Sequence, residues 1–180
     1  PPHVILGHEG EVGALAWSPT GDRLATGSGD GQIRVWDYSH NASVRILGGE
    51  EGAIKKIEWT RDGSSLAGAT LDGKIRVWKG SDLSSSIVLD GHRDQVLSIR
   101  WDSSGRYLAS GSADQTIKVW DLQHPNMPST LTGHTAPITS VDWVRDSETI
   151  VSASEDGTVR LWRPISNALL YDTDYQSILF

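Results

Sequence analysis

The sequence predicts an all-β chain made of four copies of one unit, each with four short antiparallel strands. Three observations support this prediction. Eight tryptophans form two series that advance by 42 residues, strand-like segments recur at the same spacing, and 19 glycines in 180 residues leave no sustained helical period. The first series is Trp17, Trp59, Trp101 and Trp143, and the second is Trp36, Trp78, Trp120 and Trp162.

A large apolar residue that recurs so regularly is typical of stacked structural units, because each unit must offer its neighbour the same packing surface. The whole chain, 1–180, is therefore interpreted as one repeat domain. Its repeats are expected at residues 7–48, 49–90, 91–132 and 133–174. This regularity favours a binding scaffold over an enzyme, whose reacting groups must converge on one substrate atom.

The third repeat shows most clearly how each strand is predicted. Its first strand, Val96–Trp101, places Ile99 and Trp101 on one face and Ser98 and Arg100 on the other. A turn signal follows at 102–105. The next strand, Tyr107–Ser112, is rich in small residues, which indicates close packing on both of its faces.

The rest of this repeat has a turn at 113–116, a third strand at 117–120 with alternating β-branched and large residues, and a short fourth strand at Ser129–Leu131. The other repeats carry the same pattern. The second strands share an aliphatic residue at Leu24, Leu66, Leu108 and Ile150, and the following turns share an aspartate at Asp30, Asp72, Asp114 and Asp156.

The composition narrows the class of function. The net charge of −7 argues against a protein that binds the phosphate backbone of nucleic acids, which relies on clustered Lys and Arg. The chain has no cysteine, which excludes disulfides and thiolate metal sites and fits a reducing compartment. No apolar run is long enough to span a bilayer and no signal peptide is recognisable, so the expected location is the cytoplasm or the nucleus.

The repeat carries a Gly-His pair, a turn aspartate and a closing Trp-Asp pair. Three repeats have the first pair, at Gly7-His8, Gly91-His92 and Gly133-His134, and two have the last, at Trp36-Asp37 and Trp120-Asp121. Together these motifs resemble those of the WD-repeat β-propeller family, over nearly the whole chain. Trp78 and Trp162 depart from the pattern, since Lys79 and Arg163 follow them. The resemblance implies a β-propeller of four-stranded antiparallel blades.

In this family a histidine, a strand Ser or Thr, the turn aspartate and the tryptophan form a hydrogen-bonded tetrad. Such a chain of bonds satisfies a carboxylate and an indole N–H that the blade interior would otherwise leave unpaired. The resemblance implies three tetrads here: His8, Thr26, Asp30 and Trp36; His92, Ser110, Asp114 and Trp120; and His134, Ser152, Asp156 and Trp162.

The second repeat breaks this pattern, since Glu50 replaces the histidine and Gly68 replaces the serine. Glu50 could meet Asp72 only as a like charge, so it is expected to turn outward. The second blade is therefore predicted to be the least stable of the four.

The recurring His and Asp residues could also be interpreted as catalytic dyads or metal ligands. Each His–Asp set belongs to a different blade, however, so the sets are held apart instead of converging on one substrate. The sequence therefore predicts no catalytic residue, no metal site and no cofactor.

Partner binding is the better hypothesis. The resemblance implies three positions per repeat on the face formed by the loops that enter the first strand and by the turns between the second and third strands. Leu71 and Leu97 are the most informative, because a leucine beside an exposed turn can anchor a partner, although it can equally be an isolated surface leucine. The candidate residues are Glu11, Lys55, Leu71, Gln95, Leu97, Pro137, Thr139 and Glu155.

Four blades are fewer than the number usual for this family, so they are expected to be part of a seven- or eight-bladed ring. Residues 3–6 resemble the fourth strand of a preceding blade, and residues 175–180 resemble the start of a further blade. Either a second copy or another chain could cover the free faces. The main hypothesis is a non-catalytic scaffold that binds proteins or peptides in an intracellular complex. The alternative is a self-assembling half-propeller, natural or engineered, that forms a homodimeric eight-bladed ring.

Overall fold

The computed structural model describes residues 5–38, 43–48, 52–80, 82–145, 148–164 and 168–171. These residues form four antiparallel sheets, here called blades 1 to 4, and in each blade the strand order follows the chain. Blade 1 holds β1 (Val12–Trp17), β2 (Arg23–Ser28), β3 (Ile33–Asp37) and β4 (Ser43–Leu47), and blade 2 holds β5 (Ile54–Trp59), β6 (Ser65–Thr70), β7 (Ile75–Lys79) and β8 (Ser85–Leu89). Blade 3 holds β9 (Val96–Trp101), β10 (Tyr107–Ser112), β11 (Ile117–Asp121) and β12 (Ser129–Leu131), and blade 4 holds β13 (Ile138–Trp143), β14 (Ile150–Ser154), β15 (Val159–Arg163) and β16 (Ala168–Tyr171).

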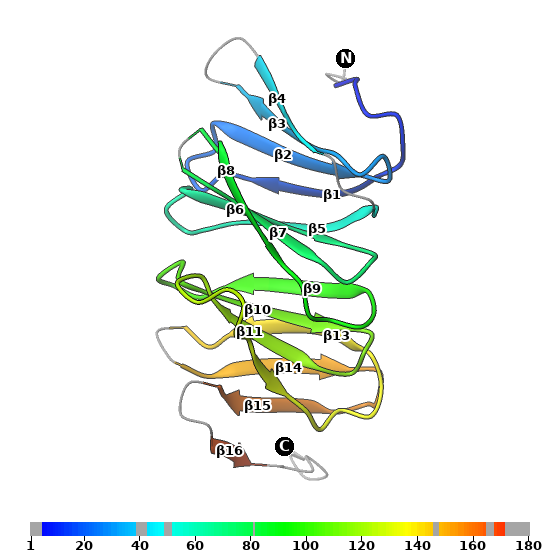
Figure 1. The fold of residues 1–180 in the computed structure, drawn as a ribbon, viewed down its shortest axis with the longest axis vertical. Helices are drawn as coiled ribbons and strands as arrows, with labels where there is room; N and C mark the ends of the chain where they lie inside the picture. Colours follow the sequence, from blue (N-terminus) through cyan, green and yellow to red (C-terminus); the bar gives the residue numbers. More distant parts are fainter. Residues whose placement is uncertain are drawn as a thin grey trace, which may run out of the picture.

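The all-β prediction is confirmed, and within the described ranges no helix exists that could cross a membrane. The blades stack in chain order, with blade 1 and blade 4 at opposite ends of the stack (Figure 1). The first strand of each blade packs on the first two strands of the blade before it: β5 on β1 and β2, β9 on β5 and β6, and β13 on β9 and β10.

The hydrophobic core is divided among the junctions between blades. At the junction of blades 2 and 3, Ala69 and Val77 from one blade pack with Val96, Ile99 and Trp101 from the next. Equivalent clusters join blade 1 to blade 2 and blade 3 to blade 4. Each inner blade therefore buries both of its faces. This agrees with the close packing that the small residues of the second strands predicted.

Hydrogen bonds cross the same junctions. The indole Nε1 of Trp59 donates to the carbonyl oxygen of Ala16 at 3.2 Å, and that of Trp101 donates to the carbonyl of Glu58 at 3.2 Å. In blade 4, the indole of Trp143 donates to the carbonyl of Arg100 at 3.0 Å. The first tryptophan series thus ties each blade to the main chain of its predecessor.

The turn between the second and third strands requires a left-handed residue. Gly31, Gly73 and Gly157 occupy this position with φ of 76°, 87° and 82°, and glycine adopts such values without steric cost. In blade 3 the same position holds Gln115 at φ 70°, so this turn carries a backbone strain that the other three lack.

Two predictions concern the ends of the chain: a strand of a preceding blade at residues 3–6 and the start of a further blade at residues 175–180. Residues 3, 4 and 175–180 lie outside the described residues. Ile5 and Leu6 are described and belong to no strand. The expected fourth strand of the last repeat is β16.

Candidate functional site

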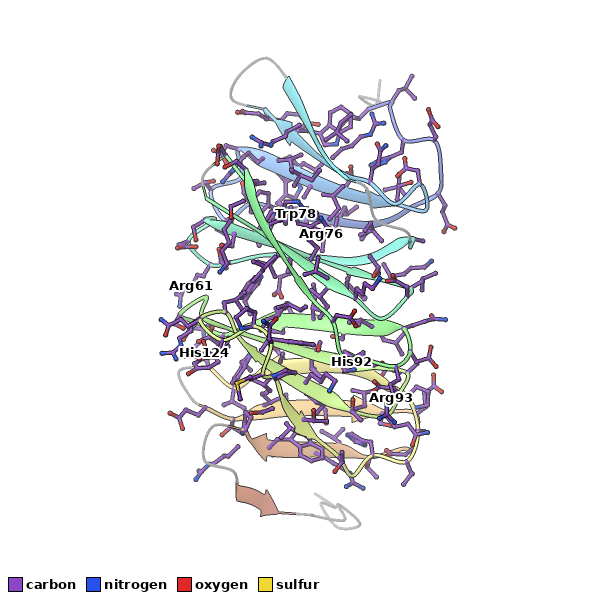
Figure 2. All side chains as sticks on the ribbon, in the orientation of Figure 1. Arg61, Arg76, Trp78, His92, Arg93 and His124 are labelled. Atoms are coloured by element: carbon purple, nitrogen blue, oxygen red, sulfur yellow. The ribbon has the colours of Figure 1, made fainter. Side chains whose placement is uncertain are left out.

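The edge of the stack that carries His92 and Arg93 is here called the histidine rim (Figure 2). It consists of the loops that lead into β1, β5, β9 and β13 and of the turns that follow β2, β6, β10 and β14. The opposite rim carries Arg61 and His124 (Figure 2). Both the tetrad residues and the predicted partner-binding residues involve elements that end at the histidine rim.

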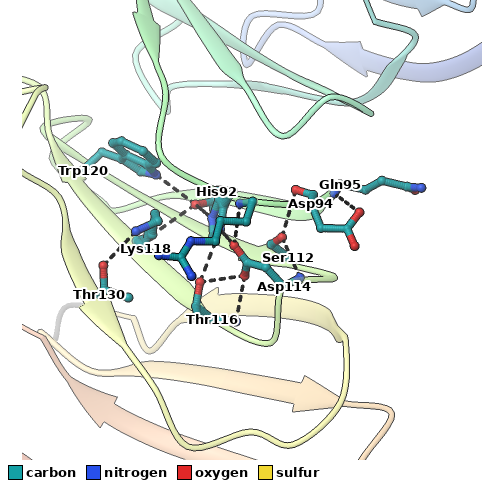
Figure 3. Close-up of polar contacts among 11 residues, drawn as sticks. His92, Asp94, Gln95, Ser112, Asp114, Thr116, Lys118, Trp120 and Thr130 are labelled. Carbon is teal, nitrogen blue, oxygen red and sulfur yellow. Dashed lines mark hydrogen bonds and ion pairs between the residues drawn. The ribbon is translucent and has the colours of Figure 1, made fainter.

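Blade 3 brings its four predicted tetrad residues together, and Figure 3 labels three of them, His92, Asp114 and Trp120. Nδ1 of His92 lies 2.8 Å from Oδ2 of Asp114, and Nε2 lies 2.8 Å from Oγ of Ser110. The indole Nε1 of Trp120 donates to the same Ser110 oxygen at 2.9 Å. A neutral His92 that donates from Nδ1 can accept from the Ser110 hydroxyl, which gives one continuous chain from tryptophan to aspartate.

The other two complete sets have the same geometry. In blade 1, His8 lies 3.0 Å from Asp30 and 2.8 Å from Thr26, whose hydroxyl accepts from Trp36 at 3.0 Å. In blade 4, the corresponding distances are 2.6, 2.7 and 2.8 Å for His134–Asp156, His134–Ser152 and Trp162–Ser152. Each network stays within one blade, so the structure does not bring the three histidines together.

The turn aspartates also organise the main chain of the rim. In blade 3, Asp114 accepts from the backbone N–H of Arg93 and of Thr116, each at 2.9 Å, and from the Thr116 hydroxyl at 2.7 Å. Burial alone would raise the pKa of Asp114, but these donors and His92 lower it to about 2. At His92, burial lowers the pKa more than the Asp114 carboxylate raises it. The pKa of His92 is therefore below 6.5. The pair therefore consists of a carboxylate and a neutral imidazole near pH 7.

Blade 2 has a different arrangement around its turn aspartate. Asp72 accepts from the Thr70 hydroxyl and lies 3.4 Å from Nζ of Lys74. A Cβ at Gly68 would lie 2.5 Å from Cδ1 of Ile33 in blade 1, so an apolar side chain occupies the space that a serine would need. Within the described part of the chain, the indole N–H of Trp78 has no hydrogen-bond partner. The expectation that Glu50 turns outward lies outside the described residues.

The predicted partner-binding positions lie in pairs along the histidine rim. In each blade the N–H of the turn residue donates to the carbonyl of the loop residue: Gly29 to Glu11, Leu71 to Ala53, Ala113 to Gln95, and Glu155 to Pro137, at 2.8 to 3.1 Å. The exposed candidates are Glu11, Gln95, Thr139 and Glu155, and the half-buried ones are Lys55, Leu71, Leu97 and Pro137. Leu71 and Leu97 are thus both half-buried beside the turns of the rim.

A charged chain that sequence reasoning missed crosses three blades. Glu58 lies 3.0 Å from Nη1 of Arg100 and accepts from the backbone N–H of Trp101 at 3.0 Å, while Nε of Arg100 lies 3.3 Å from Asp142. Burial, opposed by Arg100, raises the pKa of Glu58 from 4.5 to about 7. The signal was present in the sequence as residues of alternating charge spaced by 42.

These charged residues border a cavity of about 620 Å³, with Arg61 and Arg145 also at its wall. Among the described residues, no group of three or more His, Cys, Asp or Glu side chains is arranged to hold a metal ion. The tetrad side chains at the histidine rim are engaged in structural hydrogen bonds, and the arrangement is suited to the rigid presentation of the neighbouring side chains.

Comparisons with known proteins agree with this architecture. The profile of the family described as "WD domain, G-beta repeat" matches residues 1–37, 41–79, 83–121 and 126–163. The human F-box-like/WD repeat-containing protein TBL1Y is 48% identical over 40 residues, which is 22% of this chain and 8% of that protein. Human Striatin-4 is 50% identical over 40 residues, covering 22% of this chain and 5% of that protein. Ribosome biogenesis protein ERB1 of Chaetomium thermophilum is 53% identical over 34 residues, covering 19% and 4%.

A solved structure described as "Structure of U3-55K" superposes with a TM-score of 0.82 at 24% identity, covering 92% of this chain and 53% of that one. A structure of "RRP9 WD40 repeats" superposes with the same TM-score and identity, covering 92% and 52%. The chain thus spans about half the length of these solved structures, and its alignments span less than a tenth of the curated relatives. Since the family profile matches all four blades, this chain belongs to the WD-repeat family.

Proposed function

We propose that this chain is a non-catalytic protein–protein interaction scaffold, acting as a subunit or platform of a multiprotein complex in the cytoplasm or the nucleus. One observation carries the proposal: the main-chain bonds of the histidine rim hold a loop residue beside a turn residue in each blade. Binding residues on a rigid base lose little conformational freedom when a partner docks. The names of the relatives, among them a ribosome biogenesis protein, are compatible with work in assemblies.

The chemistry of the rim suggests a protein or peptide partner. Leu71 and Leu97 can supply apolar contacts, while Lys55, Glu11 and Glu155 provide charges of both signs around them. Apolar anchors within a polar rim are typical of protein interfaces. The net charge of −7 makes direct nucleic-acid or anionic-membrane binding unfavourable.

Affinity purification of the tagged chain from its source cells tests this proposal. The double variant Leu71→Asp/Leu97→Asp is compared with the unchanged chain and with Met127→Asp, since Met127 is an exposed apolar residue on the opposite rim. We expect a set of proteins that the double variant loses and the Met127 variant retains. If all three chains capture the same proteins, the histidine rim is not the binding surface.

Self-assembly into a closed ring is a second candidate function. The observation that favours it is the exposure of apolar side chains on the outward faces of blade 1 and blade 4, at positions buried elsewhere in the stack. Light scattering over a dilution series tests it. A stable mass near twice 19.6 kDa supports self-assembly, and a soluble monomer at all concentrations contradicts it.

A further inference from the structure

The two outer faces of the stack expose side chains whose equivalents are buried at the inner junctions. On β1, Val12, Leu15 and Trp17 are 50, 67 and 51% exposed, whereas the equivalent residues of β5 and β9 are at most 9% exposed. On β15, Val159 and Leu161 are 51 and 37% exposed, whereas their equivalents on β11 are at most 5% exposed. Among the described residues, the face of blade 1 that points away from blade 2 and the face of blade 4 that points away from blade 3 are therefore uncovered.

The polar groups of an inner junction are also present on these faces. At the junction of blades 3 and 4, Ser98 accepts from the backbone N–H of Val141 at 3.2 Å, beside the bond from the Trp143 indole to Arg100. Ser140 is the equivalent of Ser98 and is exposed on blade 4. In the described ranges, neither the Ser140 hydroxyl nor the Trp17 indole has a hydrogen-bond partner. A blade 1 docked on blade 4 would place Leu15 N–H at Ser140 and the Trp17 indole at the Asp142 carbonyl.

Side-chain size supports the same pairing. Where the second strand has glycine, the next blade offers isoleucine: Ile54 packs on Gly27, and Ile138 lies 2.7 Å from where a Cβ of Gly111 would be. Where the second strand has Ala69, the next blade offers the smaller Val96, and both are fully buried in one cluster. Alanine has one carbon more than glycine, and valine has one carbon fewer than isoleucine. The gain on one side of the junction is thus matched by the loss on the other.

The outer faces repeat this match. Blade 4 presents Ala153 at the position of Ala69, and blade 1 presents Val12 at the position of Val96. An alanine therefore faces outward at one end and a valine at the other, which is the pairing found between blades 2 and 3. This agreement between the two ends of one chain favours a second copy as the occupant.

We propose that a second copy of this chain covers both outer faces, with Val12, Leu15 and Trp17 of one copy packed on Ala153, Val159 and Leu161 of the other. The proposal rests on the self-assembly candidate above and specifies its contacts. The interface is head-to-tail and occurs twice, which gives eight blades, within the range found for propellers. Closure leaves no free face, so assembly ends at two copies.

Cysteine cross-linking tests this register, because the chain contains no cysteine of its own. Val12→Cys and Ala153→Cys are prepared as separate chains, each at an exposed or half-buried position, and are oxidised alone and after mixing. The double variant Ala69→Cys/Val96→Cys is the positive control, since its cysteines meet within one chain. We expect cross-linked dimer in the mixture at a yield at least tenfold above that of either chain alone.

The outcomes separate the register from self-assembly itself. A dimeric mass without cross-linking in the mixture, or cross-linking of Val12→Cys with itself, contradicts the head-to-tail register while self-assembly stands. A monomeric mass for the unchanged chain overturns both, and would mean that blades of another polypeptide cover the faces. None of these outcomes affects the proposal of partner binding at the histidine rim, because the affinity purification tests that proposal separately.

Discussion

Blade 2 and blade 3 have the same strand order and the same strand pairing, yet different interactions hold them. Blade 3 relies on an internal network from Trp120 through Ser110 and His92 to Asp114. Blade 2 lacks this network and is tied to its neighbours instead. Ile33 from blade 1 fills the space above Gly68, and Glu58 reaches Arg100 and Trp101 in blade 3. A blade can therefore replace internal hydrogen bonds with contacts to the adjacent blades.

The largest expected effect comes from the turn aspartates. Asp114→Asn in blade 3 removes a charge that accepts four hydrogen bonds, and we expect the free energy of unfolding to fall by about 3 kcal/mol. Asp72→Asn in blade 2 is the matched control, with an expected loss of less than about 1 kcal/mol because Asp72 is exposed. Urea denaturation of both variants provides the measurement. Equal losses would show that the two blades do not differ in the way described.

An attempt to restore the missing serine should destabilise blade 2. In Gly68→Ser the new Cβ would meet Cδ1 of Ile33 at 2.5 Å, and we expect a loss of about 1–3 kcal/mol from overpacking. Ile33→Val removes that carbon, so the double variant should recover part of the loss. Thermal and urea unfolding of the single and double variants give the coupling energy. No recovery would mean that Ile33 is not what occupies the site.

The junction of blades 2 and 3 should respond to pH through Glu58. Its folded-state pKa of about 7 lies above the ordinary 4.5, so the native state binds this proton more tightly than the unfolded chain does. Stability from this group is complete below pH 4.5 and is lost as the pH rises through 7. Between pH 5 and 8 we expect a decrease of about 1–2 kcal/mol that is absent in Glu58→Gln.

His92 acts in the opposite direction, because its lowered pKa makes its contribution complete above pH 6.5 and lost as the pH falls. His92 is present in the unchanged chain and in Glu58→Gln. The difference between the pH profiles of these two proteins therefore reports on Glu58 alone. Denaturation midpoints at pH 5, 6.5 and 8 provide the comparison. Parallel profiles would exclude a pH-dependent tie between the two blades.

The smallest expected effect is a gain in blade 3. Gln115 adopts φ 70° where blade 2 has Gly73, so Gln115→Gly should relieve strain and stabilise the chain by about 0.5–1 kcal/mol. Gly73→Gln places the same strain in blade 2 and should cost a similar amount. Thermal unfolding measures both changes. A loss on Gln115→Gly would show that the side chain contributes more than its backbone conformation costs.

Local patterns were enough to predict much of this architecture. Alternation and turn residues predicted the strands of the third repeat, and the resemblance to the WD-repeat family implied the side chains that meet around His92, His8 and His134. The replacement of serine by Gly68 was visible in the sequence. Its compensation by Ile33 was not, because that contact depends on how closely two blades approach.

The same reason explains the missed charged chain. Glu58, Arg100 and Asp142 alternate in charge at the repeat spacing, but only the structure shows that each side chain reaches the next blade. Leu71 and Leu97 illustrate a related limit. Sequence position places them beside a turn, whereas their half-buried state depends on neighbouring side chains.

The indole bonds of Trp59, Trp101 and Trp143 end on main-chain carbonyls, and the residues that supply those carbonyls are Ala16, Glu58 and Arg100. An apolar, an acidic and a basic residue thus perform the same structural task, because every amino acid has a carbonyl group. The indole bonds therefore place no requirement on the side chain at these three positions. Over evolutionary time, such a chain can alter the chemical character of the cavity that Glu58 and Arg100 border while the indole bonds between its blades stay the same.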